Sequence, residues 1–233
     1  MAGSAQDGAG KSLARIRLVI FDLDGTLIDS QQDLVNSVNA TRTWMGLPAL
    51  DDHLVASYVG NGAPVLIRRA LGDEASQDDV DRALEHFLAH YREHMLDHTK
   101  LYPGVRESLD MLKDRGLNMA VLTNKPVRFS QLLVEGLGLA SHFDRVYGGN
   151  SFPDRKKPDP IGIETLRAEV GAEKEATLMV GDSAVDVKTA RNAGVLVAGV
   201  TFGFQPESFE DDPPDLLIDR MEHLAAMIVH GRG

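Results

Sequence analysis

The sequence predicts an α/β fold in which a central parallel sheet flanked by helices is interrupted by one all-helical insertion. Residues 18–21 form an apolar run with the length and branching of a strand buried on both faces. From about residue 101 onward, short apolar runs alternate with helical patterns, as in a parallel sheet with helical crossovers. Between these parts, residues 31–100 show helical patterning with short breaks and no convincing strand.

This pattern divides the chain into four segments. We expect a flexible N-terminal tail at residues 1–15, a first part of the core domain at 16–30, the helical insertion at 31–100 and the second part of the core at 101–233. Within the tail, Ala5, Gly10, Lys11 and Ser12 nearly match a nucleotide-binding P-loop. Such a loop must follow a buried strand, and too few residues precede it here, so nucleotide binding is disfavoured.

The composition is ordinary for a globular protein, with 43% hydrophobic and 25% charged residues. No apolar run approaches the roughly 20 residues that span a bilayer, and residues 1–12 lack the apolar centre of a signal peptide. The absence of cysteine fits a cytoplasmic protein. A net charge of -11 argues against nucleic-acid binding, which needs clustered Lys and Arg. We therefore expect neither a nucleic-acid nor a membrane partner.

The first predicted strand ends at two acidic residues, Asp22 and Asp24, followed by a turn at Gly25 and Thr26. Open α/β proteins bind their ligands at the carboxyl edge of the sheet, where these acids are expected to lie. Two neighbouring acids repel each other unless a cation is close, and carboxylate oxygens suit Mg²⁺. The alternative is a solvated Asp-x-Asp turn.

The other elements are predicted from apolar periodicity and from end signals. Asp29 or Ser30 is expected to cap a helix that ends at Gly46. In the second part of the core, we expect helices at 105–115, 126–137, 161–169 and 221–229, and strands at 119–122, 145–147, 178–180, 195–200 and 216–218.

The insertion contains a glycine-rich turn, Gly60-Asn61-Gly62, just before an amphipathic helical stretch at residues 65–71. That stretch carries Arg68 and Arg69. The segment is either a plain interhelical turn with solvated arginines or a loop that faces the substrate.

Four histidines recur at four-residue spacing in the insertion: His86, His90, His94 and His98. On a helix this spacing places neighbours one above another. A metal site usually also needs carboxylate or carbonyl groups that hold the ligands in place. Adventitious binding of Ni²⁺ or Zn²⁺ is therefore favoured over a physiological site.

Polar residues also follow two later strands and occupy a loop between them. Thr123-Asn124-Lys125 supplies a hydroxyl, an amide and backbone N–H groups where a helix begins, which suits an anion. Lys156-Lys157-Pro158 is a basic loop. Asp182 follows a strand and Asp186 lies about one helical turn further, so both can face one edge. Taken alone, Asp182 is equally a candidate helix cap.

These residues should converge, because the carboxyl ends of parallel strands meet at one edge of the sheet. Acidic groups beside one lysine and one hydroxyl would form a site for Mg²⁺ and a phosphoryl dianion. The residues concerned are Asp22, Asp24, Thr123, Lys157, Asp182 and Asp186.

The four blocks resemble the ordered motifs of the haloacid dehalogenase superfamily: 22–26, Thr123-Asn124, Lys157-Pro158, and 181–183 with Asp186. The resemblance implies a Rossmann-like core with a helical cap domain, Asp22 as nucleophile and Asp24 as general acid and base. It also implies Mg²⁺ held by the Asp22 carboxylate, the Asp24 carbonyl and Asp182, with Asp186 binding directly or through water.

Three further patterns resemble the phosphoglycolate phosphatases: 59–62, 101–105 and 123–126. This implies a small phosphate monoester as substrate, with 2-phosphoglycolate the best candidate. Thr123, Asn124 and Lys157 would bind phosphate, and Gly60, Asn61, Gly62 and Arg69 would contact the rest of the substrate. Two segments depart from the pattern, Gly149-Asn150-Ser151 and Ile161-Gly162-Ile163, and both lie outside the catalytic set.

Two other functions share this chemistry. A phosphomutase of the beta-phosphoglucomutase type would return the phosphoryl group to a bound sugar. A receiver-type signalling module would keep the group on the aspartate without turnover, which leaves the large insertion unexplained. Metal-independent dehalogenation is disfavoured because it leaves Asp24 and Asp182 without a role. The oligomeric state, monomer or homodimer, stays open.

Overall fold

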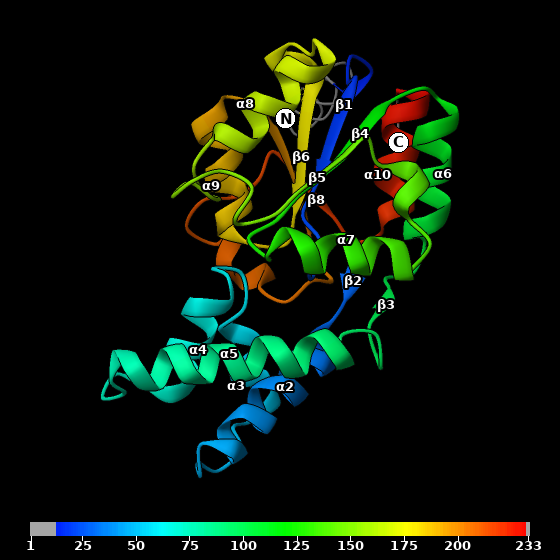
Figure 1. Ribbon diagram of the computed structural model, residues 1–233. Helices are drawn as coiled ribbons and strands as arrows, with labels where there is room; N and C mark the ends of the chain where they lie inside the picture. Colours follow the sequence, from blue (N-terminus) through cyan, green and yellow to red (C-terminus); the bar gives the residue numbers. More distant parts are fainter. Residues whose placement is uncertain (1–12, 232–233) are drawn as a thin grey trace.

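The computed structural model describes residues 13–231, and a six-stranded sheet lies at its centre (Figure 1). The strand order is β5-β4-β1-β6-β7-β8, and every neighbouring pair is parallel. The prediction of a parallel sheet is confirmed, and each predicted strand of this sheet is present to within one residue at either end. The strands are β1 (Leu18–Phe21), β4 (Asn118–Leu122), β5 (Arg145–Tyr147), β6 (Thr177–Gly181), β7 (Leu196–Val200) and β8 (Leu216–Ile218).

Helices cover both faces of the sheet, which explains the uninterrupted apolar run of β1. Val19 and Phe21 belong to one buried cluster, whereas Leu18 and Ile20 belong to a second. Successive side chains of a strand point to opposite faces, so a strand covered on both sides must be apolar throughout. The first cluster includes residues of α6 (Val105–Asp114), α7 (Val127–Gly136) and α10 (Met221–His230), and the second includes residues of α8 (Ile161–Val170) and α9 (Ala184–Ala193).

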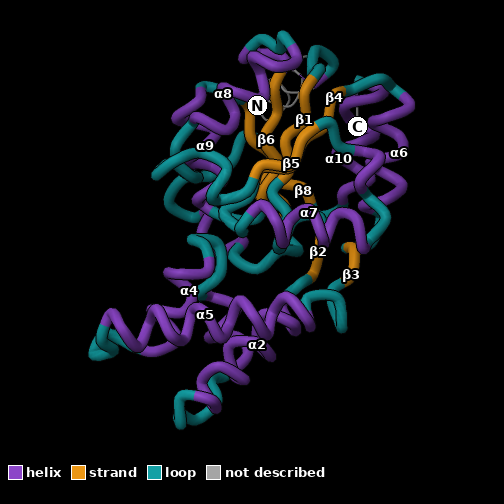
Figure 2. Tube along the Cα trace, in the orientation of Figure 1, coloured by secondary structure: helices purple, strands orange, loops and turns teal. Residues whose placement is uncertain are grey.

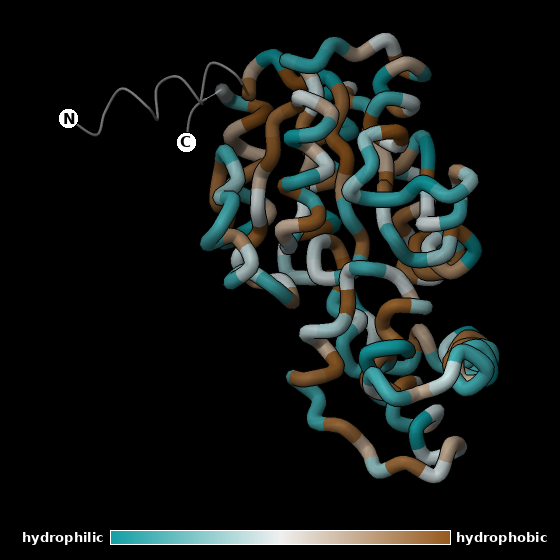
Figure 3. Tube along the Cα trace, turned by 90° about the vertical axis from the view of Figure 1, so that its left-hand side faces the viewer, coloured by the Kyte–Doolittle hydropathy of each residue, from teal (hydrophilic) through white to brown (hydrophobic). Residues whose placement is uncertain are grey.

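The hydropathy of the chain follows this layered arrangement. Figure 3 shows hydrophobic segments gathered along the strands inside the core and hydrophilic segments on its outer helices and loops. Three short 3-10 helices complete the core, η1 (Ala140–His142), η2 (Lys174–Ala176) and η3 (Pro206–Phe209).

The insertion is helical, as predicted, and forms a separate lobe beside the sheet (Figure 2). The longest helix, α5, packs against α2, and α4 also contacts α5. Buried residues at helical spacing, such as Val80, Ala83, Phe87 and Tyr91, line the inner face of α5. The helices are α2 (Gln31–Trp44), α3 (Asp52–Ser57), α4 (Ala63–Leu71) and α5 (Gln77–His94).

The two chain crossings between core and insertion pair with each other. β2 (Ile28–Asp29) and β3 (Lys100–Leu101) form an antiparallel ribbon with Ile28 opposite Leu101. Beside it, the buried Asp33 carboxylate accepts hydrogen bonds from the His98 and Thr99 backbone N–H groups. The expectation of no strand in residues 31–100 is therefore wrong at Lys100. A two-residue strand is too short to produce a sequence pattern.

Two predictions near the N-terminus need correction. Leu13 is buried in the first cluster, so the core begins at or before Leu13 and the predicted tail of residues 1–15 is too long. The P-loop-like stretch lies outside the described residues. Ser30 occupies the N-cap position of α2, but its side chain makes no capping bond. Its hydroxyl instead donates to Asp24. Within residues 13–231, no helix is long and apolar enough to cross a membrane.

Candidate active site

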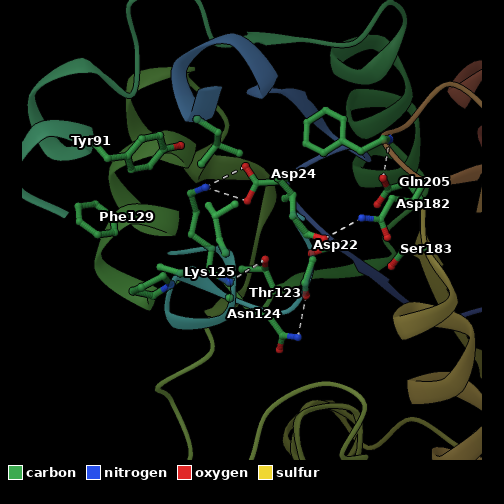
Figure 4. A pocket seen from close by; sticks show the side chains of 18 of the residues that line it. Asp22, Asp24, Tyr91, Thr123, Asn124, Lys125, Phe129, Asp182, Ser183 and Gln205 are labelled. Carbon is green, nitrogen blue, oxygen red and sulfur yellow. Dashed lines mark hydrogen bonds and ion pairs between the residues drawn. The ribbon is translucent and has the colours of Figure 1, made fainter. Parts of the chain in front are cut away.

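A pocket lies between the carboxyl edge of the sheet and the helical insertion (Figure 4). The space open to a water-sized molecule inside it is about 50 Å³. Core residues that follow the strands form one side, and apolar residues of α2, α4, α5 and α7 form the other. The lining includes Asp22, Asp24, Thr123, Asn124, Lys125, Asp182, Ser183 and Gln205 from the core, with Leu34, Gly60, Gly62, Leu66, Phe87, Leu88 and Tyr91 from the insertion.

Three carboxylates converge at the sheet edge as predicted. Oxygens of Asp22, Asp182 and Asp186 all lie within 4.8 Å of one another, and all three residues are buried. Glycine permits this approach, because a Cβ atom at Gly25 would lie 2.1 Å from Asp182 Oδ2. The φ angle of +79° at Gly25 also favours glycine there.

Lys157 lies behind this cluster and pairs with two of its members. Its Nζ atom is 2.9 Å from Asp22 Oδ1 and 2.6 Å from Asp186 Oδ1. Burial alone would lower the pKa of Lys157, but Asp186 and Asp22 together outweigh burial and hold it above its usual range. Lys157 therefore stays an ammonium group at neutral pH.

The surroundings of Asp22 and Asp182 raise the pKa values of both carboxyl groups. Burial, opposed by Lys157 and reinforced by Asp186, raises the pKa of Asp22 to about 6. Burial, then Asp186 and Asp22, raise the pKa of Asp182 well above its usual range. Burial is the largest cause of both shifts, so the surroundings of Asp22 and Asp182 disfavour their ionised forms.

The donor set fits a divalent cation. Carboxylate oxygens suit Mg²⁺, and an ion placed among them would stabilise the ionised forms that burial and the neighbouring carboxylates disfavour. The ionisable side chains at the site carry a net formal charge of about -2 by their ordinary charges. They are the carboxylates of Asp22, Asp24, Asp182 and Asp186 and the ammonium groups of Lys125 and Lys157.

Asp24 points to a different part of the pocket from Asp22. The Lys125 Nζ atom lies 2.9 Å from Asp24 Oδ1 and 2.8 Å from Oδ2, and the Ser30 hydroxyl also donates to Oδ1. Both Lys125 and Asp24 side chains are largely buried. These donors fix the orientation of the Asp24 carboxyl group.

Lys125 is the site residue that the sequence prediction missed. The sequence assigned to 123–125 a hydroxyl, an amide and backbone N–H groups, and gave the lysine side chain no role. Its ammonium group lies 4.7 Å from the centre of the Tyr91 ring. The sequence did contain a signal for this role, because Lys125 is a basic residue in the same short loop after β4 as Thr123 and Asn124.

The predicted phosphate-binding residues have unequal positions. Thr123 lines the pocket and is buried. The Asn124 side chain donates instead to the Gly60 and Lys157 carbonyl oxygens, each at 3.0 Å, and so joins the insertion to the basic loop. The Leu23 N–H group donates to Asp22 Oδ1 at 2.8 Å.

The start of α9 decides between the two interpretations of Asp182. Ser183 is the N-cap residue, and Asp186 completes a capping box with it. Asp182 is therefore not the cap, and its Oδ2 atom accepts the Phe204 N–H at 2.7 Å. The helix cap thus fixes Asp186, while Asp182 faces the pocket.

The predicted substrate contacts of the insertion are only partly in place. Gly60 and Gly62 line the pocket, but Asn61 does not, and its carbonyl oxygen accepts a hydrogen bond from Lys156 at 2.8 Å. Arg69 is exposed outside the pocket and lies 3.5 Å from the Tyr58 carbonyl oxygen. Leu66 on the same helix is buried and lines the pocket, whereas Arg69, three residues further on, is exposed and does not. A substrate contact by Arg69 therefore stays a prediction that this arrangement does not support.

The histidine row does not assemble a metal site. The helix ends at His94, so His98 does not continue the row. The Nδ1 atoms of His86, His90 and His94 contact Thr41, Ser37 and Asp97 respectively, at 3.1, 3.0 and 2.8 Å. The imidazole rings therefore stack along α5 with separate partners.

Comparison with known proteins agrees with this geometry. Residues 19–200 match the haloacid dehalogenase-like hydrolase family. A phosphoglycolate phosphatase of Chromobacterium violaceum is 42% identical over 201 residues, which cover 84% of this chain and 90% of that protein. One of Haemophilus influenzae is 36% identical and covers 92% of this chain and 99% of that protein.

Solved structures support the same assignment. A protein described as a predicted phosphoglycolate phosphatase of Haemophilus somnus superimposes with a TM-score of 0.85 at 33% identity. The match covers 92% of this chain and 97% of that one. The chain therefore belongs to the haloacid dehalogenase-like hydrolases and is a phosphatase of that family.

Proposed function

We propose that this phosphatase hydrolyses a small phosphate monoester, with 2-phosphoglycolate the best candidate, through an aspartyl-phosphate on Asp22. The observation that carries the proposal is the position of Asp22, which is buried at the end of β1, lines the pocket and lies 2.9 Å from Lys157. The names of the similar proteins support 2-phosphoglycolate.

In the proposed mechanism, an Asp22 oxygen attacks phosphorus and the bond to the leaving oxygen breaks. Asp24 gives a proton to that oxygen, and in the second step it accepts one from the water that attacks the aspartyl-phosphate. Lys157 and the Thr123 hydroxyl stabilise negative charge on the phosphoryl oxygens. Lys125 and Ser30 hold Asp24 in place for both proton transfers.

The residues that would hold Mg²⁺ are Asp22 and Asp182, with Asp186 directly or through water and, as the family resemblance implies, the Asp24 carbonyl. The bound ion would supply charge neutralisation at the phosphoryl oxygens. The insertion acts as a cap in this proposal, because its residues line the side of the pocket that faces the acids. A cytoplasmic location stays a prediction.

Phosphate release from a panel of phosphoglycolate, sugar phosphates, nucleotides and pyrophosphate tests the proposal. We expect Mg²⁺-dependent release that is fastest with phosphoglycolate. The Asp22→Asn variant should lose turnover, because it lacks the nucleophile. Near-normal release by Asp22→Asn would contradict a covalent intermediate, and sugar phosphate isomers among the products would indicate a mutase.

A further inference from the structure

The pocket wall formed by the insertion and α7 is apolar except at one place. Leu34, Leu66, Phe87 and Phe129 lie on this wall, opposite the buried carboxylates. A phosphate ester whose phosphorus lies at Asp22 must place its leaving group toward this wall. The polar groups found there therefore decide which leaving groups are accepted.

The polar place on this wall is formed by Lys125 and Tyr91. Two of the three N–H donors of an ammonium group account for the two Lys125 contacts with Asp24. Tyr91 is 1% exposed, and its hydroxyl makes no hydrogen bond of good geometry among the described residues, although the neighbouring Lys125 ammonium group opposes the effect of burial on its pKa. Figure 4 shows this hydroxyl directed toward the side of the pocket where Lys125 and Asp24 meet.

A buried hydroxyl without a partner is unfavourable, so its retention at a ligand pocket points to a ligand atom. Burial raises the pKa of Tyr91 to about 12, so the hydroxyl keeps its proton at neutral pH and is a donor. Lys125 is paired with Asp24, and its remaining N–H donor and the Tyr91 hydroxyl lie side by side on an apolar wall, where they can donate to the two oxygens of a carboxylate.

The distance from Asp22 limits the size of the ligand. Two residues of extended chain span at most about 7 Å, so the Asp24 backbone lies close to Asp22, and Lys125 contacts the Asp24 side chain. In 2-phosphoglycolate, three bonds separate phosphorus from the carboxyl carbon. Asp22, Lys125 and Tyr91 line one pocket, which suits a compact ester of this kind.

We propose that Lys125 and Tyr91 form a subsite for a second anionic group of the substrate, a carboxylate on the leaving group. One carboxylate oxygen accepts from the Lys125 ammonium group and the other from the Tyr91 hydroxyl, while Lys125 keeps its contact with Asp24. The inference rests on the proposed function and adds the residues that select the leaving group. Because the wall around the subsite is apolar, a neutral or cationic group there gains little.

The test compares three esters that differ in the group at the second carbon: 2-phosphoglycolate, ethyl phosphate and O-phosphoethanolamine. Their kcat/KM values are measured for the wild type, Lys125→Met, Tyr91→Phe and Lys113→Met. Lys113 is a control lysine on α6, where its ammonium group donates to the Ser141 carbonyl oxygen at 2.7 Å.

We expect the wild type to prefer 2-phosphoglycolate over ethyl phosphate, and O-phosphoethanolamine to be the poorest of the three. Lys125→Met should lower the phosphoglycolate-to-ethyl phosphate ratio by roughly 10- to 100-fold, and Tyr91→Phe by about 5- to 10-fold. Lys113→Met should leave the ratio unchanged. Tyr91→Phe removes one atom that makes no hydrogen bond to the protein, so it tests the subsite even where Lys125→Met fails to fold.

Equal losses on both substrates in Lys125→Met, with no change of the ratio in Tyr91→Phe, would overturn the subsite and leave Lys125 as a partner of Asp24. A wild type that releases phosphate from ethyl phosphate and 2-phosphoglycolate equally would overturn it too, while the proposed phosphatase stands. Release from no ester would instead contradict the proposed function. In that case, calorimetry measures the binding of 2-phosphoglycolate and ethyl phosphate to the wild type and to Lys125→Met. A preference of the wild type for 2-phosphoglycolate that Lys125→Met loses would support the subsite, and equal binding of both esters to the wild type would overturn it.

Discussion

Replacing the nucleophile should stabilise the metal-free protein at neutral pH. In the folded protein the pKa of Asp22 is raised from 3.8 to about 6, chiefly by burial. An acid with a raised folded-state pKa binds its proton more tightly in the folded state. The free energy of unfolding therefore falls as pH rises from about 4 to about 6, and the whole penalty is present above about pH 6.

A shift of about 2 units corresponds to about 3 kcal/mol at neutral pH. Asp22→Asn keeps the shape of the side chain but carries no charge, so it should avoid most of this penalty. For a chain of this size, the gain would raise the melting temperature by roughly 5–10 °C. The loss of the Asp22 contact with Lys157 works in the opposite direction, and the pKa of Asp22 already includes it.

Thermal unfolding of wild type and Asp22→Asn in chelator, at several pH values from 4 to 8, measures the effect. The difference in melting temperature between Asp22→Asn and the wild type should be small near pH 4, grow toward pH 6 and then level off. Mg²⁺ should shrink it, because the ion stabilises the wild type more than the variant. Asp211→Asn, at an exposed carboxylate outside the site, should show no such dependence. A destabilised Asp22→Asn at pH 7 in chelator, or a difference independent of pH, would refute the reasoning.

Four further results are expected. Chelator should abolish phosphate release and Mg²⁺ should restore it; full activity in chelator would contradict a metal role for Asp182. Arg69→Ala should change kcat/KM for phosphoglycolate less than about threefold, because the side chain lies outside the pocket, and a loss of 10-fold or more would show that it reaches the substrate. Asp33→Ala should lower the free energy of unfolding by about 2–3 kcal/mol in urea titrations, since it leaves the buried N–H and hydroxyl groups of Thr99 without their acceptor; a change within 0.5 kcal/mol would contradict this. Gln205→Ala should raise KM several-fold with little effect on the melting temperature, as it removes two contacts between core and insertion, and an unchanged KM would show that these contacts do not matter for binding.

The sequence predicted the core well because its signals are local. Short apolar runs followed by Asp22, Asp182 or Thr123 mark strand ends, and parallel topology alone then brings those ends together. The parts that escaped prediction depend on contacts between distant segments. Ser30 leaves its cap position because Asp24 is close in space, and Tyr91 reaches the pocket from a helix that lies far along the chain.

Substrate contacts in the insertion were the least predictable for the same reason. Helical periodicity gives the buried face of α4 but not which part of that face meets the core. Which residues of α4 meet the core depends on the crossing at β2 and β3, and these two strands are too short to be recognised in the sequence. Arg69 and Leu66 are three residues apart on one helix, yet only Leu66 lines the pocket.

The core and the insertion contact each other at two places, and the contacts differ in kind. At the crossing, a β-ribbon and the buried Asp33 carboxylate join the chain segments. Between α3 and α4, the hydrogen bonds that residues 57–61 accept from the described part of the core come from side chains: Gln205 donates to the Ser57 and Val59 carbonyl oxygens, Asn124 to Gly60 and Lys156 to Asn61.

Each of these side-chain contacts is an ordinary hydrogen bond worth about 1 kcal/mol net, and water can replace those near the surface. The ribbon and Asp33 have no such ready replacement, because Asp33 is 1% exposed. Opening of the pocket should therefore break the contacts at 57–61 and pivot at the ribbon. Since Asn124 also holds the Lys157 carbonyl oxygen, it links closure of the insertion to the loop that positions Lys157 beside Asp22.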